Sequence, residues 1–315
     1  MNKFTLSFKK INRKSIAQAG GKGASLGEMQ SAGFPIPSGF VILASTFEKY
    51  LDDTDLNVEI ESILKKVNSK NMESVEEASE VINHLIKKTS IESNMEKDIL
   101  VEFKKLKAKF VAVRSSATTE DSKIDSWAGE LESYLNTTEK SLIENVKRCW
   151  MSLFTPRAIF YRFARKLEKQ KISVAVVVQE MVESEISGVA FSVHPVTKDY
   201  DQAIIEAGFG LGEAIVLGKI TPDSYVVSKK DNKILDINIS EQNKMVVRKG
   251  INGDVKDILV PNSKKDKQKL NNKEIVQLSN IVKKIEQHYG SPQDVEWAYR
   301  KGNFYVVQAR PITTL

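Results

Sequence analysis

The sequence has 315 residues, of which 41% are hydrophobic and 28% are charged, and its formal net charge is +6. This length suits about two domains, and the balance of apolar and charged residues is that of an ordinary globular protein. The single cysteine, Cys149, excludes a disulfide framework and a cysteine-rich metal site. The longest apolar run, VAVVV at 174–178, has the length of a strand, so we expect a cytoplasmic protein with no signal peptide and no membrane span.

The excess of basic residues could indicate a nucleic-acid partner, but its distribution argues against one. Residues 1–27 carry six bases and no acid, whereas residues 51–100 carry twelve acids against six bases. The stripe of basic and aromatic residues that is typical of nucleic-acid binding does not recur along the chain. We therefore expect no nucleic-acid partner, and a small anionic ligand suits the charge equally well.

The first half of the chain predicts mostly helices. After a short first strand, residues 20–42 indicate a glycine turn, a helix and a strand, and helical spacing over 46–108 predicts three surface helices. Further along, we predict a strand at 110–117, a long loop at 118–130, and helices at 139–151 and 156–168, the second beginning with Pro156 at its first position.

The second half predicts mostly strands. They are expected in SVAVVVQEMV, SGVAFSV, QAIIEAG, SYVVSK, KILDINI and KMVVRK, followed by a helix at 273–289 and a hairpin at 295–312. The expected fold is therefore α+β, with a helix-rich first lobe over 1–178 that includes the helical insert 46–108. A strand-rich second lobe over 179–315 is expected to meet the first at a cleft.

Two glycine-rich stretches lack the standard phosphate-binding patterns. GGKGAS at 20–25 does not fit the Walker A loop, and GFGLGEA at 208–214 has Glu213 where the dinucleotide fingerprint needs its third glycine. Glycine N–H groups at the start of a helix can still bind an anion, and Lys22 stands beside three glycines there. The alternative is a helix entry with a solvent-exposed lysine, which these residues alone slightly favour.

The stretch VRSSATTED places an arginine at the end of an apolar strand. Arg114 is followed by Ser115, Ser116, Thr118 and Thr119, all of which have short hydrogen-bonding side chains. A guanidinium in that position is either part of a structural ion pair or a clamp on phosphate oxygens.

Polar residues interrupt the apolar strands of the predicted C-terminal hairpin. Gln308 and Arg310 are two residues apart and therefore share a face of their strand. With Glu296 they form either a mutual hydrogen-bonded network or a site in which carboxylate and amide oxygens bind Mg²⁺ and the arginine binds phosphate. Spacing alone favours neither. The three histidines have no metal-ligand spacing.

Taken together, ten stretches resemble one family in the family's own order. This family is the ATP-binding, ATP-grasp-like domain of phosphoenolpyruvate synthase, pyruvate phosphate dikinase and rifampicin phosphotransferase. The resemblance covers nearly the whole chain apart from 52–108 and 250–272. The stretches are GGKGASLGEM, GFPIPSGF, VRSSATTED, WAGELESYLN, CWMSLFTPRAIFYR, VVQEMV, SGVAFSVHPVT, GLGEAIVLGKITPDSY, PQDVEWAY and VVQARPIT.

The resemblance implies ATP and Mg²⁺ as cofactors and assigns a role to each site residue. The implied set is Lys22, Arg114 and Arg310 as catalytic groups on the phosphates, Gly129 and Ser133 as further phosphate contacts, Gln179 near adenine, and Glu296 and Gln308 as metal ligands.

The resemblance also implies a reaction that needs further domains. Enzymes of the family move the β-phosphoryl group of ATP to a histidine on a swivelling domain, and AMP and phosphate are released overall. The histidine then passes the group to pyruvate or to a drug hydroxyl. A glycine-rich histidine motif is not found in these 315 residues. We therefore expect the histidine-bearing and acceptor-binding domains on the remainder of a longer chain or on a partner acting in trans. A module that binds ATP without chemistry is the alternative.

Overall fold

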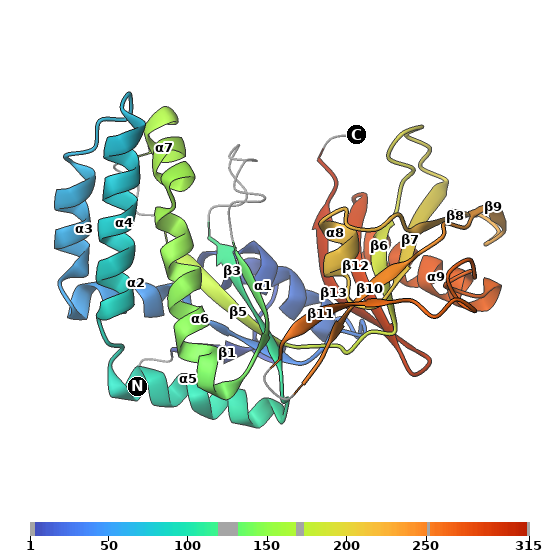
Figure 1. Cartoon of the computed structure of the whole chain (residues 1–315), viewed down its shortest axis with the longest axis horizontal. Coiled ribbons are helices and arrows are strands. Elements are labelled where there is room, and N and C mark those ends of the chain that lie inside the picture. The colour runs from blue at the N-terminus through green and yellow to red at the C-terminus, as the bar shows by residue number, and fades with distance from the viewer. Residues whose placement is uncertain (1–3, 119–131, 168–172, 251–252, 314–315) are drawn as a thin grey trace. The chain divides into compact units, whose positions relative to one another are not determined.

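The computed structural model is organised as two compact units, which are treated separately below. The first unit comprises Met1–Glu28 and Ser38–Met181, and the second comprises Met29–Pro37 and Val182–Leu315. The structure describes residues 4–118, 132–167, 173–250 and 253–313. Helices predominate in the first unit and strands in the second, which confirms the expected α+β class (Figure 1).

The first unit is built on a five-stranded antiparallel sheet in the order β1-β2-β5-β3-β4. In its central strand, residues 174–178 are valines and an alanine that are fully buried, as expected for a strand covered on both faces. The strands are β1 (Thr5–Ser7), β2 (Gly39–Ile42), β3 (Val111–Ala117), β4 (Ser133–Thr137) and β5 (Val174–Glu180).

Helices cover both faces of this sheet. The main core cluster joins alternate residues of β3 and β5 to the helices that follow β2 and β4, and α3, α4 and α6 lie side by side there (Figure 1). The opposite face packs against the N-terminal helix. The helices are η1 (Phe8–Lys10), η2 (Arg13–Ser15), α1 (Ile16–Ser31), α2 (Ala44–Asp53), α3 (Leu56–Leu64), α4 (Met72–Lys88), α5 (Ser93–Leu106), α6 (Glu139–Met151), η3 (Ser152–Phe154) and α7 (Pro156–Ala164).

The prediction of three helices over 46–108 is wrong, because that segment contains four. Asp55 adopts a left-handed conformation with φ of 57° and separates α2 from α3. A lone non-glycine residue in this region carries no strong sequence signal, since Asp and Asn also occur within helices. Helix α6 has the predicted bounds, whereas α7 begins with Pro156 as predicted but ends at Ala164, four residues early.

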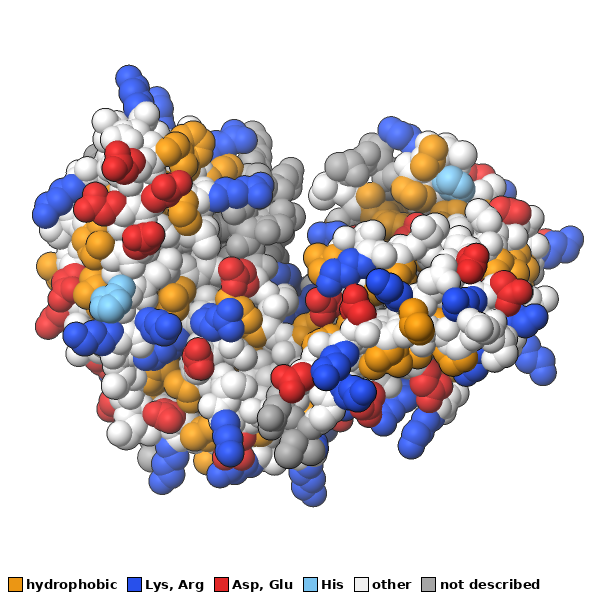
Figure 2. Space-filling view, in the orientation of Figure 1, with side chains coloured by type: hydrophobic (Ala, Val, Ile, Leu, Met, Phe, Trp, Pro, Cys, Tyr) orange, Lys and Arg blue, Asp and Glu red, His pale blue; other side chains and the backbone are white. Residues whose placement is uncertain are grey.

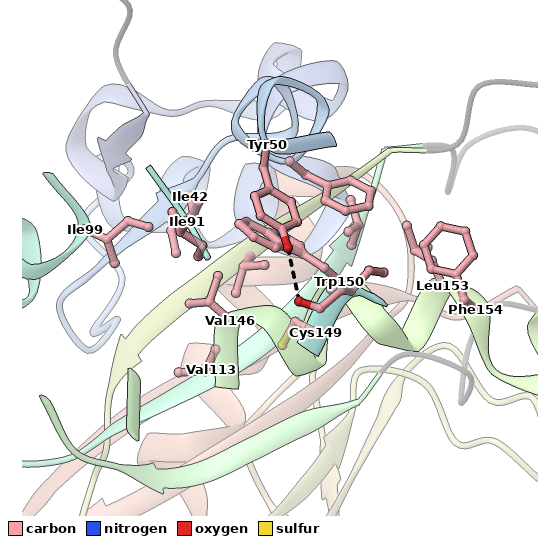
Figure 3. Packing of buried hydrophobic residues seen from close by; sticks show 14 of the residues in the cluster. Ile42, Tyr50, Ile91, Ile99, Val113, Val146, Cys149, Trp150, Leu153 and Phe154 are labelled. Atoms are coloured by element: carbon pink, nitrogen blue, oxygen red, sulfur yellow. Dashed lines mark hydrogen bonds between the residues drawn. The ribbon is translucent and has the colours of Figure 1, made fainter. Parts of the chain in front are cut away.

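The core of the first unit is centred on Trp150 of α6. Its ring stacks on Tyr50 of α2 at a centroid distance of 4.9 Å, and both side chains are fully buried (Figure 3). The Tyr50 hydroxyl donates hydrogen bonds to the carbonyls of Ile86 and Thr89, at 3.1 and 3.2 Å. Burial raises the pKa of Tyr50 to about 12, so the hydroxyl remains a donor at neutral pH. It therefore satisfies carbonyls that the end of α4 leaves without helical partners.

Cys149 lies in the same core. Its side chain is fully buried, and burial raises the pKa of the thiol well above its usual range. A thiol that stays protonated and inaccessible is unsuited to nucleophilic or metal chemistry.

The second unit contains a six-stranded antiparallel sheet in the order β13-β12-β6-β7-β8-β9, with α9 packed on one face. A separate two-stranded sheet, β10-β11, includes β11, a strand for which the sequence analysis predicted no element. The elements are β6 (Ile186–Phe191), β7 (Gln202–Phe209), α8 (Glu213–Val216), β8 (Asp223–Ser228), β9 (Ile234–Asn238), β10 (Lys244–Arg248), β11 (Val255–Leu259), α9 (Asn272–Tyr289), β12 (Gln293–Arg300) and β13 (Asn303–Pro311).

A two-residue turn sets the register of the C-terminal hairpin. Lys301 and Gly302 both have positive φ, of 48° and 80°, which is the backbone of a type I′ turn. The turn aligns β12 with β13 so that Trp297 stands opposite Val306. A bulge on β13 then shifts the register by one residue, so that Glu296 stands opposite Gln308.

A buried ion pair ties the segment after β11 to the sheet of the second unit. The Lys269 ammonium lies 2.7 Å from the Asp223 carboxylate, and neither side chain is exposed. The carboxylate also accepts hydrogen bonds from the Tyr225 hydroxyl and from the backbone N–H groups of Ser240 and Lys269. The charge is thus fully coordinated, as a buried carboxylate requires.

None of the described helices combines the length and the hydropathy that a membrane crossing needs.

We expect Tyr50→Phe to lower the free energy of unfolding by about 1 kcal/mol, because it removes a hydroxyl bonded to the carbonyls of Ile86 and Thr89 while keeping the ring. Urea denaturation measures the change. Tyr200→Phe is the matched control, since Tyr200 is 56% exposed, and it should stay within about 0.5 kcal/mol of wild type. Equal effects of the two variants would contradict the capping role of Tyr50.

Candidate functional site

One face of the first sheet carries three of the residues that the resemblance singles out. On β3, Val111 and Val113 point into the helical core, so Arg114 lies on the other face. Register pairs Arg114 with Ser133 of β4, which places both side chains on that face. Gln179 of β5 stands one strand away on the same face, because its neighbour Val178 belongs to the core.

The N-terminal helix brings Lys22 to this same face. Helix α1 packs there, and its course is broken at Gly20, where φ is 66°. After this break, the Lys22 ammonium donates a hydrogen bond of 3.1 Å to the backbone carbonyl of Ser115, the residue next to Arg114. Lys22, Arg114, Ser133 and Gln179 are therefore gathered on one surface, whereas Gly129 lies outside the described residues.

Close packing explains two glycines of the GGKG turn without any ligand. A Cβ atom on Gly20 would lie 2.2 Å from the Ser116 hydroxyl oxygen, and one on Gly23 would lie 3.0 Å from a methyl group of Val41. The glycines therefore allow α1 to approach the sheet closely. The same approach places the start of the continuing helix, where N–H groups lack helical partners, beside Arg114.

The Gln179 side chain is polar, buried and open to a partner. Only 2% of the residue is exposed, and its amide nitrogen has no hydrogen-bond partner among the described residues. An unpaired buried donor costs about 1–3 kcal/mol, so a nearby acceptor on a ligand would be stabilising.

In the second unit the predicted residues of the hairpin share the sheet face that points away from α9. Val295 and Trp297 are fully buried on the α9 side, so Glu296 projects to the opposite face together with its cross-strand partner Gln308. Arg310 lies on that face as well.

Asp294 is a residue of this surface that the sequence analysis did not consider. Arg310 donates from Nε and from Nη2 to the same Asp294 carboxylate oxygen, each over 2.8 Å. The other oxygen, Oδ1, is buried and has no partner among the described residues. The hydrogen-bonded partner of Arg310 in this structure is thus the acid two residues before Glu296.

A third carboxylate approaches from β7. Glu206 stands opposite Val189 of β6, which in turn stands opposite Glu296, so the row crosses three strands on one face. Burial is the main cause that raises the pKa of Glu206, and the Asp294 charge adds to it. Burial likewise raises the pKa of Asp294, with the Arg310 guanidinium opposing and the Glu296 carboxylate reinforcing the shift.

Burial is thus the main cause of both shifts, and the surface holds partly buried acids close together. Hard cations prefer carboxylate and amide oxygens, which Asp294, Glu296 and Gln308 provide, and Asp294 Oδ1 is an open acceptor. The described side chains do not include three His, Cys, Asp or Glu residues already gathered as a metal site. The donor chemistry thus fits a divalent cation, although the ligands are not assembled around one point.

Sequence signals for the two missed acids existed. Asp294 precedes Glu296 by two residues and must share its face if the segment is a strand. Glu206 is the one charged residue inside the apolar run AIIEAG. An acid in such a run indicates a special environment, but only the strand order brings it near Asp294.

We expect Glu206→Gln to stabilise the protein relative to wild type more at pH 7 than at pH 4. The pKa of Glu206 is raised by folding, so its contribution to stability is present at low pH and is lost as the pH rises through the folded-state pKa. Urea midpoints at both pH values, without divalent cations, measure the difference.

The control is Asp236→Asn, which removes an exposed acid from β9 at the far edge of the same sheet. It reports the effect of losing a surface charge. An identical gain in stability for Glu206→Gln at both pH values would show that ionisation of Glu206 does not destabilise the folded protein.

Comparisons with known proteins identify the family of this chain. The family described as "Pyruvate phosphate dikinase, AMP/ATP-binding domain" matches residues 16–315. A protein named probable phosphoenolpyruvate synthase from Archaeoglobus fulgidus is 44% identical over 97% of this chain and 41% of its own length. One of the same name from Methanocaldococcus jannaschii is 42% identical over 99% of the chain and 27% of its own length.

The phosphoenolpyruvate synthase of Pyrococcus furiosus is 36% identical over 99% of the chain and 44% of its own length. The chain thus spans less than half of the length of these curated relatives. Because the match extends over both units, including GGKG, VRSSA and the C-terminal hairpin, the chain belongs to the family of pyruvate phosphate dikinase AMP/ATP-binding domains.

Proposed function

We propose that the chain is the Mg-ATP-binding phosphotransferase part of a dikinase-type enzyme. It activates ATP for transfer of a phosphoryl group to a histidine on a separate swivelling domain, and onward to an acceptor such as pyruvate or rifamycin, with AMP and phosphate as products. The observation that carries the proposal is that each unit gathers its site residues on one sheet face, cationic in the first and rich in carboxylates in the second.

The first unit would hold the phosphates. Lys22 of α1 approaches Arg114 of β3, since the Lys22 ammonium reaches the carbonyl of the residue after Arg114. Two fixed positive charges and the N–H groups at a helix start are the elements that offset charge on phosphate oxygens during phosphoryl transfer. Ser133, paired with Arg114 across the strands, adds a hydroxyl on the same face.

Gln179 would lie near adenine. Its buried amide nitrogen lacks a protein partner among the described residues, and the adenine ring offers nitrogen acceptors. The strand β5 ends one residue later, at Glu180.

The second unit would hold the cation. Glu296 and Gln308 are the proposed ligands, and Asp294 joins them because its Oδ1 atom is an open acceptor beside them. Mg²⁺, when bound, would neutralise charge on the phosphates. Arg310, more than half of which is exposed, would extend toward the phosphates from its contact with Asp294.

A nucleic-acid partner is not supported by the surface. On the face drawn in Figure 2, acidic and basic side chains are interspersed over each unit rather than separated into a basic stripe.

We expect Glu296→Ala to weaken Mg-dependent ATP binding by more than about tenfold, because even partners of metal ligands contribute about 10–100-fold to metal affinity. The fold should persist, since Glu296 is not part of the buried core. Calorimetry with ATP and Mg²⁺ measures the affinity, and circular dichroism checks the fold. Asp236→Ala serves as the control acid on the same sheet, and unchanged affinity in the Glu296 variant would refute the metal assignment.

A catalytically silent ATP-binding module is the second candidate, and product analysis separates the two. We expect AMP to form when the chain, ATP and Mg²⁺ are mixed with a histidine-bearing phosphocarrier domain of a phosphoenolpyruvate synthase. Replacing the carrier histidine with alanine should abolish AMP formation. ATP binding without any AMP in the presence of a competent carrier would favour the silent module.

A further inference from the structure

The hydroxyl of Ser116 holds the GGKG turn from outside the turn. Ser116 lies on β3, two residues after Arg114, and is fully buried. Its oxygen donates to the backbone carbonyl of Ala19 at 2.9 Å and accepts from the backbone N–H of Gly23 at 3.2 Å. These two hydrogen bonds fix the chain on both sides of Gly20, where α1 is kinked.

This arrangement replaces a helix cap. A helix leaves its first N–H groups without partners, and a side chain just before the helix normally accepts one of them. Here the helix resumes after Gly20, which has no side chain, and the acceptor comes from a strand 93 residues later. The capping hydrogen bond therefore connects the turn to the sheet, whereas an ordinary cap connects two residues of the same turn.

Packing leaves the turn little freedom around this contact. A Cβ on Gly20 would meet both the hydroxyl and the carbonyl oxygen of Ser116, at 2.2 and 2.3 Å. The residue before Ser116 in turn accepts the hydrogen bond from Lys22. The Lys22 ammonium and the neighbouring N–H groups are thus held in a fixed position relative to β3, the strand that also carries Arg114.

We propose that Ser116 is a positioning residue for nucleotide phosphates: its hydroxyl sets the GGKG turn, and with it Lys22, relative to Arg114. This inference rests on the proposed ATP-binding function. Without the hydroxyl, the Ala19 carbonyl and the Gly23 N–H lose their shared partner, and the turn can shift on the sheet. Ligands that need the turn lose affinity, whereas ligands without phosphates do not.

The test compares Ser116→Ala with Ser79→Ala. Ser79 is a matched control in the same unit, because its buried hydroxyl also donates to a backbone carbonyl, of Phe154 at 2.6 Å, and accepts from an amide, of Asn83 at 3.3 Å. Calorimetry measures affinities for Mg-ATP and for adenosine, and hydrogen exchange measures protection of the Gly23 amide.

Ser116→Ala should lose about tenfold in Mg-ATP affinity, the equivalent of one buried hydrogen bond, and should keep its adenosine affinity. Its Gly23 amide should exchange faster. Ser79→Ala should match wild type in all three measurements, even where its thermal stability falls. A purely structural role of Ser116 would lower stability without separating ATP from adenosine.

The outcomes distinguish a failure of this inference from a failure of the proposed function on which it rests. Wild-type protein that binds no Mg-ATP would refute the proposed function and the inference together. Wild-type binding with equal ATP affinity in Ser116→Ala would overturn the inference alone. Ser116→Cys keeps the size but offers only a weak donor and acceptor, so it should show a smaller loss of ATP affinity. Ser116→Cys replaces Ser116→Ala if the alanine variant does not fold. Wild-type affinity of Ser116→Cys for Mg-ATP would then equally overturn the inference.

Discussion

The close contact between the glycine turn of α1 and strand β3 determines the site surface of the first unit. Gly20 touches Ser116, and Lys22 donates to the Ser115 carbonyl, so the cationic lysine is held against the strand that bears Arg114. The packing of the turn thus fixes the position of Lys22 before any ligand binds.

The second unit shows the opposite electrostatic arrangement. Asp294 and Glu206 are partly buried near one another and near Glu296, and burial raises the pKa of the first two. One arginine, Arg310, is hydrogen-bonded to this surface through Asp294. A surface that holds acids at a cost to folding is more often functional than structural, since ordinary ion pairs shift carboxylate pKa values downward. The first unit therefore gathers cationic residues on one sheet face, whereas the second gathers carboxylates on one sheet face.

Buried contacts away from the two sheet faces hold the surrounding elements in place. The stacked Trp150 and Tyr50 rings fix the helices behind the first sheet, and the buried Asp223–Lys269 pair fixes the chain beyond the second. Neither feature was assigned a role by the sequence. Buried aromatic and ionic residues appear in a sequence as ordinary helix and loop residues, because their partners are tens of positions away.

Local pattern was sufficient for much of the architecture. Alternation and apolar runs predicted β3 and β5 to β10, and Pro156, Gly302 and the 273–289 periodicity located a helix start, a turn and α9. The division of one predicted helix at Asp55 and the strand β11 were missed, because a left-handed aspartate and a polar strand have weak local signals. Parity along single strands placed Gln308 with Arg310, and ordered motifs identified the family. Which residues of different strands share a surface depended on strand order and register, since these contacts join segments far apart in the chain. Only the tertiary structure could therefore pair Arg310 with Asp294, bring Glu206 toward them, and show that Ser116 holds the turn around Lys22.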